Sequence, residues 1–83
     1  MQVQLGPYKA YLNSGRYSTS ARLLSADASI TEAECLLSPG EVTTMRDSHW
    51  EYRVLIRGVS RDMTARVFTV WFDMLDDRPK EVK

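Results

Sequence analysis

The feature that most constrains the fold is the alternation of apolar and polar side chains over residues 49–58, HWEYRVLIRG. One parity carries Trp50, Tyr52, Val54 and Ile56. Successive side chains of a strand point to opposite faces of a sheet, so this pattern predicts a strand with one buried face and one wet face. We expect the row from Trp50 to Ile56 to face the core.

A second apolar stretch, VFTVWF at residues 67–72, lacks this alternation because both of its parities are mostly apolar. A strand that is apolar on both faces is covered on both faces. We expect residues 63–75 to pair with residues 49–58 as a hairpin after a loop over residues 58–62. The second face of VFTVWF would then need a helix or another chain to cover it.

The N-terminal third predicts a further hairpin, formed by residues 3–12 and 17–24. Asn13, Ser14 and Gly15 between them are turn-forming residues. Pro7 cannot donate a backbone hydrogen bond to a neighbouring strand. The first strand therefore lies at a sheet edge or begins after Pro7.

Residues 30–37 have two interpretations. Ser29 and Glu32 have the spacing of a helical capping box, and Ser-Pro-Gly at 38–40 would end the element. These signals favour a two-turn helix. The alternative is a strand whose shared apolar parity consists of Ala33, Cys35 and Leu37.

Together these elements predict a small α+β domain in which two β-hairpins form an antiparallel sheet around one short helix (ββαββ). A small half-open β-barrel is the alternative if residues 28–37 form a strand. A chain of 83 residues makes one domain. We expect that domain to span residues 1–83, with the charged residues 76–83 as a frayed tail.

Composition argues against several functional classes. Eleven basic residues balance eleven acidic ones, so no strong overall field attracts nucleic acid or an anionic membrane. Neutral proteins also lack the repulsion that keeps copies apart, which makes a homodimer plausible. The small size predicts a thin core with little room for a substrate pocket.

The single cysteine, Cys35, rules out an intramolecular disulfide and any zinc-binding cysteine pair. The N-terminus lacks the pattern of a signal peptide, and no apolar run approaches the ~20 residues that span a bilayer. We therefore expect a cytoplasmic protein without membrane contact.

Two clusters contain chemically active residue types. Asp47, Ser48 and His49 could belong to a nucleophilic site, but no GxSxG motif surrounds the serine, and a turn explains the group better. A second cluster, made of three carboxylates, consists of Asp73, Asp76 and Asp77.

The carboxylate cluster lacks the DxDxDG signature of a calcium loop, and the chain contains no phosphate-binding glycine motif. We expect no metal, no cofactor and no enzymatic activity.

The outward parity of the hairpin is rich in arginine. Arg53 and Arg57 lie on one strand and Arg66 on its partner. With Tyr8, Tyr11 or Tyr17 as stacking partners, this Arg/Tyr face could bind single-stranded nucleic acid. Glu51 and Asp62 interrupt the patch. A wet face with cross-strand ion pairs is therefore favoured over a phosphate clamp.

The remaining signal is the aromatic stretch. Trp and Arg are common anchors of protein interfaces, which suggests an interface built from Trp71, Phe72, Phe68, Arg53, Arg57 and Arg66. The sequence favours a non-enzymatic module that docks stoichiometrically onto another protein as an inhibitor or adaptor, in the manner of small phage and mobile-element proteins. A homodimer is one form that such a module could take. The alternative is the single-stranded nucleic-acid-binding module.

Overall fold

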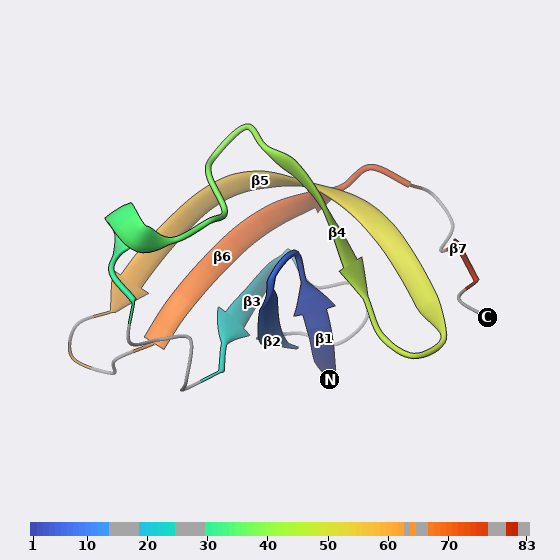
Figure 1. Cartoon of the computed structure of the whole chain (residues 1–83), viewed down its shortest axis with the longest axis horizontal. Coiled ribbons are helices and arrows are strands. Elements are labelled where there is room, and N and C mark those ends of the chain that lie inside the picture. The colour runs from blue at the N-terminus through green and yellow to red at the C-terminus, as the bar shows by residue number, and fades with distance from the viewer. Residues whose placement is uncertain (14–18, 25–29, 63, 65–66, 77–79, 82–83) are drawn as a thin grey trace.

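A computed structural model describes residues 1–13, 19–24, 30–62, 64, 67–76 and 80–81. Its strands are β1 (Gln2–Leu5), β2 (Tyr8–Leu12), β3 (Ser20–Leu23), β4 (Val42–Arg46), β5 (Trp50–Asp62), β6 (Val67–Met74) and β7 (Lys80–Glu81), with one 3-10 helix, η2 (Glu32–Glu34). The long strands β5 and β6 curve together over the shorter strands β1, β2 and β3 (Figure 1).

The sheet closes into a barrel made of two three-stranded meanders. β1–β2–β3 and β4–β5–β6 are joined by antiparallel pairing of β1 with β4 and of β3 with β6. The resulting order is β4-β1-β2-β3-β6-β5, and the pairing of β4 with β5 completes the circle. β7 adds to β5 outside this circle, at Trp50 and Glu51.

The predicted α+β class is therefore wrong, because the described residues contain no α-helix and the fold is an all-β barrel. The alternative of a small barrel fits, although the barrel is closed rather than half-open. Closure removes sheet edges that would otherwise expose unpaired backbone groups.

The helix predicted over residues 30–37 is replaced by a single 3-10 turn. A capping-type bond does form, in which the Thr31 N–H donates to Glu34 Oε2 at 2.8 Å. The turn ends because the Leu36 N–H donates to the Tyr8 hydroxyl at 3.0 Å instead of to a helical carbonyl. The chain beyond it is extended enough to bury both Cys35 and Leu37. Ser29, the predicted cap, lies outside the described residues.

The N-terminal hairpin prediction is confirmed where the structure describes it. β2 pairs with β3 in antiparallel register, and β2 begins at Tyr8, directly after Pro7. The predicted turn residues Ser14 and Gly15 lie outside the described part. The sequence reasoning missed β1 as a separate strand, which pairs with β2 across a tight turn at Gly6 and Pro7.

β5 confirms the alternating pattern but extends further than predicted. Tyr52, Val54 and Ile56 are buried, and Trp50 packs partly buried against them. The loop predicted over residues 58–62 is instead the second half of β5, reached through a β-bulge between Ile56 and Gly58. The bulge inserts Arg57 as an extra residue and switches the inward parity from even to odd numbers.

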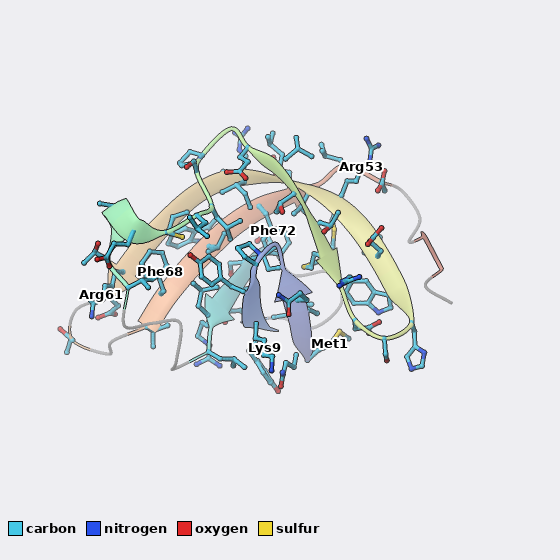
Figure 2. The ribbon with its side chains drawn as sticks, viewed as in Figure 1. Met1, Lys9, Arg53, Arg61, Phe68 and Phe72 are labelled. Carbon is cyan, nitrogen blue, oxygen red and sulfur yellow. The ribbon has the colours of Figure 1, made fainter. Side chains whose placement is uncertain are left out.

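The barrel interior is filled by side chains from the six strands and from the segment after η2. Its largest fully buried members are Phe68, Phe72, Leu5, Leu12, Met45, Ile56, Val54 and Val70. Phe68 and Phe72 lie within the curve of β5 and β6 (Figure 2). In the described part of the chain, no helix is long and apolar enough to cross a membrane.

Candidate functional site

The structure separates the aromatic residues predicted to form an interface. β6 alternates strictly, so Phe68 and Phe72 point into the barrel and are fully buried. Trp71 lies between them in the sequence, points outward and is 43% exposed. Only Trp71 of these three can therefore contribute to an outer surface of the folded chain.

Arginine is the second residue type of the predicted interface, and Arg53 forms an ion pair with Asp76. Its Nη2 lies 2.8 Å from Asp76 Oδ1, and its backbone N–H donates to Asp76 Oδ2 at 2.9 Å. The ladder between β5 and β6 ends at Val54 and Met74, so the Asp76 carboxylate takes the place of a β6 carbonyl as acceptor for the Arg53 N–H. Beside it, the Leu75 N–H donates to the Arg53 carbonyl. Arg53 points away from the barrel interior in Figure 2.

This ion pair shifts both ionisation equilibria toward the charged forms. Side-chain and backbone hydrogen bonds from Arg53 lower the pKa of Asp76 below its ordinary value. The hydrogen bond and the charge of Asp76 raise the pKa of Arg53. Both side chains are at least partly exposed, so solvent screens the pair.

Arg57 is paired as well, because its Nε lies 3.4 Å from Asp73 Oδ2 on β6. The third predicted cation, Arg66, lies outside the described residues. Two of the three arginines proposed to contact a partner thus already face a carboxylate of this chain. The outward row of β5 matches the wet, ion-paired face that the sequence favoured.

A different outer surface combines aromatic side chains with a cation that has no acidic partner among the described residues. Tyr11 on β2 lies directly opposite Arg22 on β3, and the Arg22 guanidinium sits 5.8 Å from the centre of the Tyr11 ring. Trp71 lies one strand further, diagonally from Arg22, where side chains about 7–8 Å apart can still meet. We call Tyr11, Arg22 and Trp71 the aromatic face.

Gly58 explains how Trp71 is held on that face. It pairs with Trp71 across β5 and β6, and a Cβ atom added to Gly58 would lie 3.7 Å from Trp71 Cε3. The indole therefore rests on bare glycine backbone. This packing presents one side of the ring to solvent while restraining its position.

A hollow of about 210 Å³ lies beside the aromatic face. Its lining residues are Tyr11, Arg22, Leu23, Leu24 and Val67. The paired register of β3 and β6 ends at Arg22 and Thr69, so the two strands no longer pair at the hollow. The site thus combines an apolar depression with a guanidinium and a phenol at its rim.

Charge is segregated along the chain although the total is zero. Residues 1–26 contain three basic residues and no acidic ones, whereas residues 27–83 contain eight basic and eleven acidic residues. Residues 1–26 therefore carry a net charge of +3 and residues 27–83 a net charge of −3. Lys9 lies on the outer side of β2 (Figure 2), and Arg22 lies on the outer side of the neighbouring strand β3.

The other sequence candidates have structural roles. Asp47 Oδ1 accepts the N–H groups of His49 and Trp50 at 2.7 and 3.0 Å, which confirms the predicted turn. Cys35 is buried. Among the described residues, no group of three or more His, Cys, Asp or Glu side chains could hold a metal ion.

No protein-family profile, curated protein or solved structure matches this chain. Sequence reasoning named Tyr11 only as a stacking residue and did not select Arg22 or Leu24. The signal that points to Arg22 is the absence of any acidic residue before Asp27, whereas nothing in the sequence singles out Leu24.

Proposed function

We propose that this protein is a non-enzymatic binding module that docks stoichiometrically onto another protein through the aromatic face. The observation that carries the proposal is the exposure of Trp71 and Tyr11, at 43% and 44%, on either side of Arg22. Trp, Tyr and Arg are the residue types that contribute most to binding at protein interfaces. An adaptor or inhibitor of this size would work from such a surface.

The packing of the barrel supports a surface function over a catalytic one. The large apolar side chains fill the interior, and Asp47 is engaged in its turn. The single buried thiol of Cys35 suits a reducing compartment, so we place this activity in the cytoplasm.

Single-stranded nucleic acid is the weaker candidate. Its proposed phosphate contacts included Arg53 and Arg57, and each of these faces a carboxylate that a phosphate would have to displace. Proteins that bind single strands combine stacking with a groove of cations that follows the backbone. On the aromatic face itself, Arg22 is the one cation.

Affinity capture from cells of the source organism tests the proposal. The baits are the wild type and the Trp71→Ser, Arg22→Glu and Leu75→Ser variants. Leu75 is as exposed as Trp71, at 43%, but lies next to Arg53, away from the aromatic face. We expect a protein captured by the wild type and by Leu75→Ser to be lost with Trp71→Ser and Arg22→Glu.

Circular dichroism of each bait confirms that it is folded. Capture that survives both Trp71→Ser and Arg22→Glu contradicts the proposed face. A captured species that nuclease removes supports the nucleic-acid alternative instead.

A further inference from the structure

We infer that the hollow beside Arg22 receives Leu36 of a second copy of this chain, so that copies associate through two different patches. This inference rests on the proposed function, because it names an occupant for part of the same docking surface. The inference is based on the shape and charge of two patches on separate parts of one molecule, the exposed Leu36 and the hollow beside Arg22.

The first patch is a projecting leucine. Leu36 is 66% exposed, the highest value among the exposed large apolar residues that the structure describes. Its neighbours Cys35 and Leu37 are both buried, and its N–H is held by the Tyr8 hydroxyl at 3.0 Å. Leu36 is therefore presented outward from a backbone that is anchored on both sides.

The second patch is the hollow at the end of the β3–β6 ladder. Its apolar wall is formed by the half-buried Leu24 and Val67, and its volume is about 210 Å³. A cavity of roughly 150 Å³ with apolar walls holds a benzene molecule. The hollow is therefore large enough for the four-carbon side chain of a leucine. Leu36 does not fill the hollow of its own chain, because it is exposed.

Charge favours the same pairing. Arg22 at the rim contacts the Tyr11 ring and has no acidic partner among the described residues. Glu34 precedes the projecting leucine by two residues and is exposed, with Oε2 accepting the Thr31 N–H. Seating Leu36 in the hollow would bring the Glu34 carboxylate within reach of the Arg22 guanidinium of the other copy.

The same charges argue against a contact between two aromatic faces. Strands β1, β2 and β3 carry Lys9 and Arg22 and no acidic residue, so face-to-face packing would oppose like charges. Joining the basic strands β2 and β3 of one copy, which carry Lys9 and Arg22, to the segment of the next copy that carries Glu34 brings unlike charges together. A contact between two different patches can continue from copy to copy until it closes as a ring.

Sedimentation velocity at millimolar protein concentration tests the inference. We expect the wild type to associate reversibly, and more weakly as salt is added. Leu36→Ser should raise the dissociation constant about tenfold or more, as expected from no longer burying one leucine side chain. Leu75→Ser, the matched exposed control, should leave the dissociation constant unchanged.

Charge reversal identifies the partner patch. Arg22→Glu and Glu34→Arg should each weaken self-association, because every contact then pairs like charges. An equimolar mixture of the two variants should associate again, because each contact between unlike copies pairs either the two native groups or the two reversed ones. A monomeric wild type overturns the inference, as does association that Leu36→Ser leaves intact. A mixture that stays monomeric overturns the Arg22–Glu34 contact.

These outcomes are separable from failure of the proposed function. If Leu36→Ser has no effect on the association state while Trp71→Ser abolishes capture of a different protein, the docking face stands and its occupant is not a second copy. If Leu36→Ser and Arg22→Glu abolish association while no variant changes capture, self-association stands and the docking proposal fails.

Discussion

At the scale of single residues, the outward charges of β5 act within the molecule. Asp76 accepts hydrogen bonds from both the backbone N–H and the side chain of Arg53, so one carboxylate anchors the chain after β6 to the first half of β5. Arg57 and Asp73 make only a single side-chain contact at 3.4 Å. Substitution should therefore destabilise the protein more at the Arg53–Asp76 pair than at the Arg57–Asp73 pair.

We expect Asp76→Asn to lower the thermal unfolding midpoint at neutral pH more than Asp73→Asn, because the asparagine loses the charge that attracts Arg53. The pKa of folded Asp76 lies below its ordinary value of 3.8. Its stabilising contribution is thus present above pH 3.8 and lost as the pH falls through the folded pKa.

Thermal melts of both variants and the wild type as a function of pH measure this effect. The deficit of Asp76→Asn should shrink as the pH is lowered below 3.8. If the difference in unfolding midpoint between Asp76→Asn and the wild type stays constant below that pH, the contact stabilises the fold through its geometry and not through its charge.

At the scale of elements, the β1–β2 turn links the hairpin to the strand that closes the barrel. Gly6 has φ of 56°, and its N–H donates to the Thr44 carbonyl of β4 at 2.8 Å. A Cβ atom at Gly6 would meet Leu37 Cδ2 and Thr43 Oγ1, each at 3.0 Å. The turn therefore depends on glycine for its backbone conformation and for space.

Gly6→Ala should destabilise the protein by about 1–3 kcal/mol from backbone strain alone, with an additional penalty from the two close contacts. Gly40→Ala is the matched control, because Gly40 has φ of 88° but no atom within 4 Å of the added Cβ. Chemical denaturation of both variants separates strain from crowding. Equal losses would mean that Leu37 and Thr43 move aside at no cost.

At the scale of the whole molecule, stability depends on the small core of buried side chains inside a six-stranded barrel. Small domains of this size have about 3–5 kcal/mol available from such a core. Phe72 and Trp71 are neighbours in the sequence but lie on opposite sides of the barrel wall. Substitution of these two adjacent aromatic residues should therefore lower the stability by very different amounts.

Phe72→Ala should cost about 3–5 kcal/mol and leave the chain largely unfolded at room temperature. Trp71→Ala should cost about 1 kcal/mol or less and retain the β-sheet spectrum, since surface changes are usually small. Circular dichroism with urea titration measures both. The reverse order of stabilities would contradict the assignment of faces along β6.

Part of this architecture could be predicted from local patterns. Alternation identified the first half of β5 with its inward residues Tyr52, Val54 and Ile56, and a strand start after Pro7 was one of the two options that the proline left open. Two errors of prediction arose from contacts between segments that are distant in the sequence. A bulge at Arg57 hid the second half of β5, and the Tyr8 hydroxyl took the N–H of Leu36 that a helix would have used.

The candidate site was less predictable than the strands. The sequence selected Trp71, but it placed Phe68 and Phe72 beside it, because an apolar run does not reveal which parity is inside. Arg22 gains its role only from the pairing that sets it opposite Tyr11 and diagonal to Trp71. Such neighbours belong to three different strands.

The two-residue repeat of a strand is visible in any short segment, so the sequence was enough to locate the first half of β5 and to show which of its faces is buried. Closure of the sheet became apparent only in the folded chain. Closure depends on pairs such as Leu5 with Met45, which bring together backbone groups that are distant in the chain. Backbone hydrogen bonding is common to all residues except proline, so no side-chain pattern records which strands will pair.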